Sequence, residues 1–412
     1  MLKSWLDIPA DSDFSIYNLP YGIFSLENGS PSVGVAIGEW IIDMSKAQEM
    51  GLFSLIEISE NVFDRPILND LIGLGKSFSK NIRSTLQASL TNPHSQLCEK
   101  ASEILVKRIE ARMHLPLRVG DYTDFYSSEE HATTVGKLFR PSNPQLPNWK
   151  QMPVAYHGRA SSIVVSKAPI SRPKGQIKYE DSETPVFAPT ECLDYELELA
   201  FVIGKNSELG KSVGIDEAEE YVFGALLFND WSARDIQRWE NQPLGPFTSK
   251  NFASSVSPWI VTLDALESFK IKIADQEPKP LDYLYSENNF GFDINLSVEV
   301  ISAKGNSKII TETNSKHLYW SISQQVAHHT ITGCNLRIGD LLATGTISGP
   351  EINGAGCLLE STKAGAVPFL LSNESRTYLE DGDEVIMHGY AQNGEIRVGF
   401  GTLSGKILPS FT

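Results

Sequence analysis

The sequence lacks long apolar runs and any excess of basic residues. In its 412 residues no stretch approaches the roughly 18 apolar residues of a membrane-spanning helix, and the start MLKSWLDIPADSDF reaches acidic residues too early for a signal peptide. Lys and Arg total 35 against 51 Asp and Glu, a formal net charge of −16. Because nucleic acids and anionic membranes bind basic surfaces, we expect neither as a partner, and we expect a cytoplasmic protein.

Cysteine pairs and nucleotide-binding motifs are also missing. The cysteines (Cys98, Cys192, Cys334 and Cys357) are scattered, with no CxxC pair and no histidine at zinc-finger spacing. We therefore expect reduced, mostly structural thiols, which fit the cytoplasm. The glycine-rich GTISGPEINGAGCLLE does not match a P-loop or a strand-linked GxGxxG, and no GxSxG elbow is present. Neither nucleotide binding nor serine hydrolysis is favoured.

The pattern of expected secondary structure changes near residue 115. Before it, short alternating runs flank the turns ENGSP and IGEW, and helical patterns cover residues 65–90 and 95–115. After it, short strands, glycines and prolines dominate, with helices expected at 216–223 and 317–329. We predict a mostly β (α+β) protein, with a small N-terminal β domain and docking helices in residues 1–115 and a β-rich domain in residues 116–412.

Strands of the second domain are expected where apolar and polar residues alternate or where apolar runs end at turn residues. The expected segments are MPVAY, SSIVVS, YELELAFVIG, VFGALLFND, SPWIVTL, GFDINLSVEVIS, DLLATGTIS, DGDEVIMHGYA and IRVGFGTLSGKIL. Strands that follow one another without regular helices between them argue against a doubly wound α/β sheet.

The stretch DYELELAFVIG places acidic residues on one face of an expected strand. Leu197 and Leu199 point one way, whereas Asp194, Glu196 and Glu198 point the other way. Two glutamates at this spacing lie about 7 Å apart along the backbone, close enough to converge on one cation. The alternative is a solvated strand face, which this stretch taken alone favours.

Further acidic and basic groups could join that site. Asp230 ends an apolar strand in FGALLFNDWSARDIQRWE, and a capping box between Ser232 and Asp235 is expected to start the helix that follows. Asp230 is a candidate for the cation site, and an ordinary cap or turn residue is the alternative. Asp124 and His131 occur in DYTDFYSSEEHATTVGKLFR, which looks too broken for a regular helix or strand. His131 is a candidate general base because imidazole titrates near neutral pH, although a lone histidine is more often structural.

Two cations are candidates for binding an anionic substrate in this acidic protein. Arg140 ends GKLFR and Lys250 follows QPLGPFTS, and either could hold a carboxylate or polarise a carbonyl. Ordinary surface charges are the alternative for both residues.

Seven motifs, in order along nearly the whole chain, resemble the fumarylacetoacetate hydrolase family. They are HLPLRVGDYTDFYSSEEHATTVGKLFRP, LPNWKQMPVAYHGRASSIVVS, LDYELELAFVIG, FNDWSARDIQRWE, PLGPFTSKNF, GCNLRIGDLLATGTISG and DGDEVIMHGYAQ. The resemblance implies hydrolysis of a carbon–carbon bond of 4-fumarylacetoacetate to fumarate and acetoacetate, the last step of tyrosine and phenylalanine degradation. It also implies an SH3-like N-terminal β-barrel, a mixed C-terminal β-roll and a homodimer that binds a small diketo dicarboxylate.

The resemblance also implies residue roles. The carboxylates that match the family's metal ligands, for Ca²⁺ or Mg²⁺, are Asp124, Glu196, Glu198 and Asp230. His131 matches the base and Glu360 the carboxylate that orients it. The residues that match oxyanion and carbonyl contacts are Arg140, Gln237 and Lys250, and those that match substrate contacts are Tyr126, Tyr156 and Thr346, with Arg140 and Gln237.

The sequence departs from the family pattern at three positions. Asn241 stands where the family has a substrate-contacting tyrosine, and Ala253 and Ser254 replace a glycine and a threonine near a second cation. Ser254 keeps the hydroxyl, so a second Mg²⁺ site near Lys250 and Ser254 is retained as an expectation. Asp194 matches no family role and is expected to be solvated or to cap a helix.

Two other functions compete with the hydrolase. One is a decarboxylase, hydratase or isomerase of another β-keto acid, since the same acidic metal site stabilises enolates in the wider superfamily. The other is a non-catalytic protein whose carboxylates hold a structural Ca²⁺. The N-terminal domain and the pair His131 and Glu360 favour the hydrolase.

Overall fold

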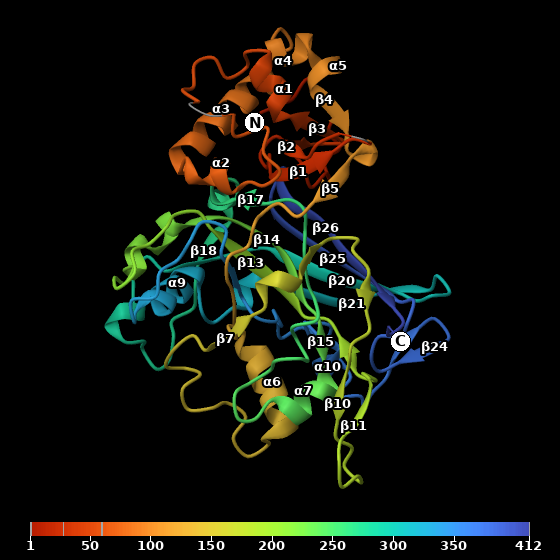
Figure 1. Cartoon of the computed structure of the whole chain (residues 1–412). Coiled ribbons are helices and arrows are strands. Elements are labelled where there is room, and N and C mark those ends of the chain that lie inside the picture. The colour runs from red at the N-terminus through yellow and green to blue at the C-terminus, as the bar shows by residue number, and fades with distance from the viewer. Residues whose placement is uncertain (1, 28, 59–60, 412) are drawn as a thin grey trace.

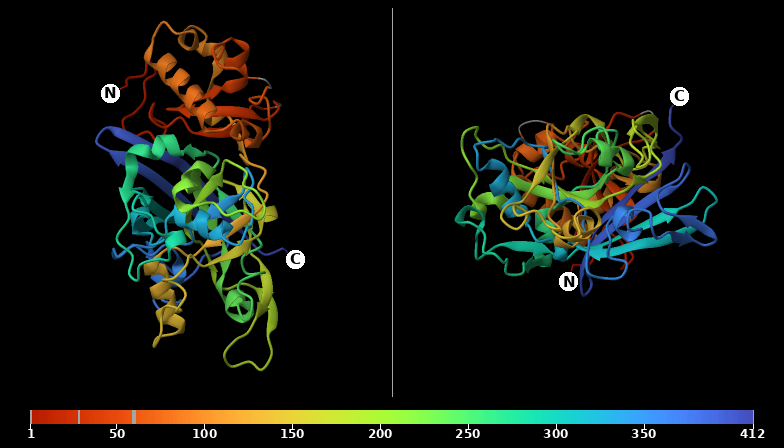
Figure 2. Two further views of the ribbon diagram at one scale, coloured as in Figure 1. Left: turned by 90° about the vertical axis from the view of Figure 1, so that its left-hand side faces the viewer. Right: turned by 90° about the horizontal axis from the view of Figure 1, so that it is seen from below.

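The computed structural model describes residues 2–27, 29–58 and 61–411. Two units lie end to end, a small one built from the first part of the chain and a larger one built from the rest (Figures 1 and 2). Both are built on β-sheets, which agrees with the mostly β class expected from the sequence. The boundary at residues 115 and 116 stays a prediction. No described helix combines the length and apolar character needed to cross a bilayer.

The N-terminal unit is an antiparallel sheet in the order β4-β3-β2-β1-β5. Its strands are β1 (Tyr21–Ser25), β2 (Ser32–Ile37), β3 (Trp40–Asp43), β4 (Leu105–Lys107) and β5 (Arg112–His114). The expected turns ENGSP and IGEW do join neighbouring antiparallel strands, since β1 pairs with β2 and β2 pairs with β3. Asn28 of the first turn lies outside the described residues.

Helices cover the N-terminal sheet (Figure 1). They are α1 (Met44–Glu49), α2 (Asn69–Gly73), α3 (Lys76–Thr91), α4 (Gln96–Glu99) and α5 (Ala101–Ile104). The pattern in residues 65–90 is confirmed by α2 and α3, whose apolar face enters the core. The helix expected over residues 95–115 is wrong beyond Ile104. There β4 pairs with β3 and β5 pairs with β1, so sheet pairing overrides the local helical spacing.

The larger unit contains two main sheets, in the orders β7-β6-β22-β13-β14-β16-β8 and β21-β20-β25-β26-β9. The first is formed by β6 (Tyr122–Phe125), β7 (Ala155–Gly158), β8 (Ile163–Val165), β13 (Leu197–Ile203), β14 (Val222–Asp230), β16 (Ser254–Val256) and β22 (Leu341–Ala343), with β17 (Val261–Thr262) paired to β14. The second is formed by β9 (Ile170–Ser171), β20 (Asn295–Ile301), β21 (Ser307–Asn314), β25 (Glu384–Asn393) and β26 (Ile396–Leu408). Every segment of this unit expected as a strand overlaps one, although MPVAY shares only Ala155 and Tyr156 with β7.

Shorter elements complete the larger unit. The small sheets use β10 (Lys174–Ile177), β11 (Val186–Pro189), β12 (Leu193–Asp194), β15 (Ser232–Ala233), β18 (Lys270–Lys272), β19 (Phe290–Phe292), β23 (Phe369–Leu371) and β24 (Glu374–Arg376). The helices are α6 (Glu129–Phe139), α7 (Arg234–Glu240), α8 (Leu263–Leu266), α9 (Ile322–Thr330), α10 (Leu358–Ser361) and the 3₁₀ helix η3 (Ile215–Tyr221). The elements α6, α7, β10 and β11 lie at the end remote from the N-terminal unit (Figure 1).

Strand β13 is buried on both faces, so the solvated strand face is wrong. One face, which includes Leu197 and Leu199, packs into the same core as side chains of the second sheet. On the other face, Ala200 and Val202 share a core with side chains of the N-terminal unit, such as Ile23. The N-terminal unit therefore covers the apolar part of this face, which carries Ala200 and Val202. Glu196 and Glu198 follow at the uncovered end.

Candidate active site

Four carboxylates converge at one end of the first main sheet. Asp124 lies on β6, Glu198 on β13 and Asp230 at the end of β14, while Glu196 directly precedes β13. Their oxygens lie within 4.8 Å of one another. Glu198 and Asp230 are 0% exposed, and Asp124 and Glu196 are nearly as deeply buried. The fold thus brings together the acids that were expected as metal ligands, although Asp124 and Asp230 at the two ends of this set are more than one hundred positions apart in the sequence.

Two of these carboxylates are neutralised by buried cations. Lys250 Nζ donates to Glu196 Oε2 and, at 2.7 Å, to Asp230 Oδ2. Arg234 Nη1 lies 2.9 Å from Glu196 Oε1. Burial by itself would raise the pKa of Glu196, but the charges of Lys250 and Arg234 outweigh burial and lower that pKa to about 2. Glu196 therefore stays ionised at neutral pH.

The other two carboxylates, Asp124 and Glu198, each have an oxygen that a bound metal cation could contact. Asp124 Oδ1 and Glu198 Oε1 are buried and have no hydrogen-bond partner among the described residues. Burial, and then the neighbouring carboxylates, raise the pKa of both side chains well above the ordinary range. An unpaired buried charge destabilises a protein by about 3–5 kcal/mol. Oxygen ligands of this kind suit Ca²⁺ or Mg²⁺, so the residues present fit a divalent cation.

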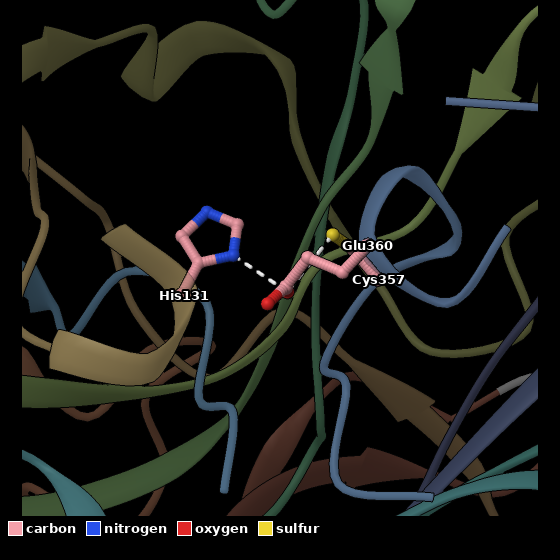
Figure 3. Close-up of side chains that lie close together, drawn as sticks. All are labelled: His131, Cys357 and Glu360. Atoms are coloured by element: carbon pink, nitrogen blue, oxygen red, sulfur yellow. Dashed lines mark hydrogen bonds and ion pairs between the residues drawn. The ribbon is translucent and has the colours of Figure 1, made fainter. Parts of the chain in front are cut away.

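His131 and Glu360 form a buried pair (Figure 3). His131 Nδ1 lies 2.6 Å from Glu360 Oε2, and the same oxygen accepts hydrogen bonds from Ser348 Oγ at 2.8 Å and Cys357 Sγ at 3.2 Å. Burial raises the pKa of Glu360, but the charge that His131 carries when protonated, together with these hydrogen bonds, outweighs burial and lowers that pKa. An ionised Glu360 accepts the Nδ1 proton of His131, which leaves Nε2 of the neutral ring free to accept a proton.

A regular helix presents His131, contrary to the broken segment expected from the sequence. Strand β6 is followed directly by α6, and Ser128 caps that helix by accepting a hydrogen bond from the backbone N–H of His131 at 3.3 Å. Ser128 Oγ also donates to the carbonyl of Ser348 at 3.2 Å. Ser348 Oγ in turn donates to Glu360. Ser348 therefore connects the start of the helix that carries His131 to the carboxylate of Glu360.

The capping box expected at Ser232 and Asp235 is wrong. Ser232 lies in β15 and its hydroxyl donates to the carbonyl of Asp230 at 3.0 Å, so α7 begins at Arg234 without a side-chain cap. Asp235 instead accepts hydrogen bonds from Thr190 Oγ1 and from the backbone N–H of Glu191. The local spacing resembled a capping box, but the pairing of β15 with β12 holds Ser232 in a strand.

Asp194 caps a helix, as expected, but it is not solvated. It is fully buried and accepts the backbone N–H groups of Leu358 and Leu359, at the start of α10, at 2.7 and 2.9 Å. Arg234 Nε donates at 2.8 Å to Oδ2 of Asp194, the oxygen that also accepts the N–H of Leu359. Asp194 and Arg234 thus connect Glu196 to the short helix that carries Glu360.

The predicted substrate contacts are only partly assembled around the carboxylates. Tyr156 donates from its hydroxyl to Asp230 Oδ2 at 2.5 Å, and the ring of Tyr126 meets that of His131 edge-on with centroids 5.2 Å apart. Thr346 Oγ1 is buried without a hydrogen-bond partner among the described residues. Ser254 Oγ donates to Asp230 Oδ1 at 3.2 Å, close to Lys250.

Arg140, Gln237 and Asn241 are not bonded to the carboxylates in the described part of the chain. Arg140 is exposed and donates to the carbonyl of Pro144 at 3.2 Å. Gln237 Oε1 accepts from Arg234 Nη1 at 3.2 Å, and Asn241 is exposed at the end of α7.

Sequence reasoning missed three residues that hold the site in place. Tyr122 donates from its hydroxyl to Asp124 Oδ2 at 2.5 Å; its position two residues earlier on the same strand was the available signal. Arg234 and Ser348 bond to Glu196 and Glu360 respectively, across sequence separations that no local pattern reveals.

Comparisons with known proteins point to one family. The model described as "Fumarylacetoacetate (FAA) hydrolase C-terminal" matches residues 121–407, and the one described as "Fumarylacetoacetase N-terminal" matches residues 17–116. Fumarylacetoacetase from Bos taurus is 46% identical over 99% of this chain and 99% of its own length; that from Homo sapiens is 47% identical with the same coverage. Fumarylacetoacetase from Arabidopsis thaliana is 47% identical over 100% of this chain and 99% of its own.

A solved structure has the same fold. The fumarylacetoacetate hydrolase from Exiguobacterium antarcticum aligns with a TM-score of 0.54 at 18% identity, covering 95% of this chain and 99% of that one. So low an identity shows a shared fold alone.

Proposed function

The chain belongs to the fumarylacetoacetase family and hydrolyses fumarylacetoacetate, and we propose that His131, Glu360 and the carboxylate cluster carry out this reaction. The observation that supports these roles most directly is the 2.6 Å hydrogen bond that orients a buried histidine, whose charge also acts on Glu196 of the carboxylate cluster. Fumarate and acetoacetate are the expected products, which places the enzyme at the end of tyrosine and phenylalanine degradation.

His131 is the proposed general base. With its Nδ1 proton donated to Glu360, Nε2 accepts a proton from a water molecule, and the hydroxide formed attacks the substrate carbonyl beside the bond to be broken. Glu360 stabilises the imidazolium that results. The hydroxyl group ends on the fumarate carbon, and the electron pair of the broken carbon–carbon bond goes to acetoacetate, which takes up the proton from His131 or Lys250.

The oxyanion that forms after attack needs nearby donors. Lys250 is already buried at the carboxylate cluster, and we propose that Arg140 and Gln237 turn toward the substrate when it binds, as catalytic contacts often tighten only in the complex. The proposed substrate contacts are Tyr126, Tyr156 and Thr346. Asn241 is a further proposed contact, at the edge of the substrate site. The unpartnered Oγ1 of Thr346 supports its role, because a substrate oxygen would satisfy it.

A divalent cation is proposed to bind Asp124, Glu196, Glu198 and Asp230. When bound, it supplies positive charge to the oxygens of the β-diketone and so stabilises the enolate that leaves. Ca²⁺ and Mg²⁺ both suit an all-oxygen site. We place a second Mg²⁺ near Lys250 and Ser254, supported by the Ser254 hydroxyl beside Asp230.

The reaction is tested by following the ultraviolet absorbance of the diketo acid while both products are quantified. The hydrolase should form fumarate and acetoacetate in a one to one ratio. A decarboxylase would release carbon dioxide, whereas an isomerase or a hydratase would form a single product. Lack of turnover of this substrate would contradict the proposal.

Tyr122→Phe should weaken cation binding by about 10- to 100-fold while kcat at saturating cation stays nearly unchanged. The Tyr122 hydroxyl occupies Asp124 Oδ2 and leaves Oδ1 for the cation, so its loss frees the carboxylate to rotate. Isothermal titration calorimetry with Ca²⁺ measures the effect. Tyr195→Phe is the matched control, because it removes a buried hydroxyl that bonds to Thr311 Oγ1 at 2.8 Å. An equal loss in both variants would assign the effect to packing.

We propose a homodimer that uses an apolar patch on α7, the loop after it and β11. The patch contains Leu244, which is 95% exposed, Phe247 at 66% and Phe187 at 74%, beside the partly exposed Trp239. Trp239 Nε1 donates to Gln176 Oε1 at 3.1 Å, and Gln176 pairs with Phe187, so α7 lies beside β11. Large exposed apolar side chains that gather on one surface are typical of protein interfaces. Leu244→Asp combined with Phe247→Asp should convert a dimer to a monomer in sedimentation velocity. Leu209→Asp, at another exposed leucine, should leave the dimer intact.

Three finer assignments remain our proposals. The antiparallel order β4-β3-β2-β1-β5 supports an SH3-like barrel for residues 1–115, and the mixed pairing of the larger sheets supports a β-roll for residues 116–412. The free thiols of Cys98, Cys192, Cys334 and Cys357 support the cytoplasm as its location.

A further inference from the structure

Cys357 is a buried thiol that the proposed mechanism does not use. Its sulfur lies 3.2 Å from Glu360 Oε2, the oxygen that His131 Nδ1 also contacts at 2.6 Å. Figure 3 shows both the ring nitrogen and the sulfur directed toward this carboxylate. One ligand atom from each residue lies within 4.8 Å of the others, and all three side chains are buried.

These three side chains form a donor set of a different kind from the carboxylate cluster. Imidazole nitrogen, thiolate sulfur and carboxylate oxygen are the ligands of zinc, whereas Ca²⁺ and Mg²⁺ select oxygen alone. Zinc bonds of about 2.0–2.3 Å place neighbouring ligand atoms roughly 3.3–3.8 Å apart in a tetrahedron. Glu360 Oε2 now lies 2.6 Å from His131 Nδ1 and 3.2 Å from Cys357 Sγ, which are hydrogen-bond lengths. Each of these distances needs to increase by less than about 1 Å for a zinc ion to replace the shared hydrogens.

We propose that His131, Cys357 and Glu360 form an inhibitory zinc site, distinct from the four-carboxylate cluster. Binding releases one proton, from the thiol, while the proton of Nδ1 moves to Nε2 of the same ring. The ion thus takes the side of the imidazole that faces Glu360, and a water molecule completes the tetrahedron. With a proton on Nε2, His131 has no lone pair left to accept one from the attacking water.

The inhibitory part of this inference rests on the proposed role of His131 as base, but the binding part does not. Sequence spacing cannot reveal such a site, because His131 and Glu360 are separated by 229 positions.

The first test measures hydrolysis with buffered zinc in the presence of saturating Ca²⁺ and Mg²⁺. Zinc should inhibit the full-length wild-type enzyme, and Cys357→Ser should require at least about tenfold more zinc for half-inhibition. Serine retains a hydroxyl that can donate to Glu360. Cys334→Ser, which removes an exposed thiol, should keep the wild-type sensitivity. Equal sensitivity of Cys357→Ser and wild type would overturn the proposal, because zinc would then act at the carboxylates or elsewhere.

The second test detects binding without activity. Co²⁺ added as a probe to the Ca²⁺-saturated enzyme should produce a thiolate-to-cobalt charge-transfer band in wild type and in Cys334→Ser, and no such band in Cys357→Ser or Cys357→Ala. A band retained in the Cys357 variants would overturn the site. A band that depends on Cys357 without zinc inhibition would overturn the inhibitory role. Failure of the family reaction itself is distinguishable, because it would appear as lack of turnover before any zinc is added.

Discussion

Replacing His131 by alanine should reduce kcat for fumarylacetoacetate by about 10²- to 10⁴-fold while cation binding is retained. The expected loss follows from the position of the ring: Nδ1 is held by Glu360, and Nε2 is the atom left to activate water. In the described part of the chain, none of the four clustered carboxylates (Asp124, Glu196, Glu198 and Asp230) is hydrogen-bonded to this imidazole. In this variant kcat should therefore fall while the affinity for the cation stays unchanged.

Stopped assays of both products measure the change in kcat, and calorimetry with Ca²⁺ measures cation affinity in the same preparation. His157→Ala is the matched control, because His157 lies on the neighbouring strand β7 with an exposed side chain. It should retain nearly full activity. A His131→Ala enzyme with wild-type kcat would show that another group activates the water.

Replacing Glu198 by glutamine should weaken cation binding by at least about 100-fold and should lower activity in parallel. Glu198 Oε2 accepts the backbone N–H of Gly345 at 3.1 Å, while Oε1 has no partner, so one oxygen is held and the other is left for a ligand. Glutamine keeps the shape and the first contact but removes the charge. The loss therefore reports on the cation and not on packing.

Thermal unfolding distinguishes a loss of cation binding from a loss of packing in this variant. A cation at one hundred times its Kd stabilises the native state by about 2.7 kcal/mol, and Glu198→Gln should lose most of this gain. In chelator the variant should be at least as stable as wild type, because one of four crowded buried carboxylates has been neutralised. Glu312→Gln, at an exposed position of β21, should behave as wild type in both conditions. A Glu198→Gln enzyme with an unchanged response to Ca²⁺ would exclude Glu198 as a ligand.

Much of the fold could be predicted because it depends on neighbouring residues. Period-two alternation identified β13 and the long strands β25 and β26, and turn residues identified the hairpins of the N-terminal sheet. These signals are local, since a pleated strand places alternate side chains on opposite faces wherever it lies. The motifs that carry the family resemblance likewise named the four carboxylates and the histidine, but not their arrangement.

Only the tertiary structure decided which local signals prevail. Residues 105–114 carry a helical pattern but pair at the edges of the N-terminal sheet, where strand hydrogen bonds replace helical ones. Asp194 was expected to be solvated or to cap a helix, and only the fold brings Arg234 and the start of α10 to it.

The sequence by itself determined which side chains are available, an acidic set for a hard cation and a histidine for proton transfer. Tertiary structure determined which of them meet. It covered one part of the β13 face with the N-terminal unit, left Glu196 and Glu198 at the other end, and placed Cys357 beside Glu360 and His131. The physical reason is that charge burial and ligand geometry depend on every element packed around a site, whereas a sequence pattern records only the element that carries the residue.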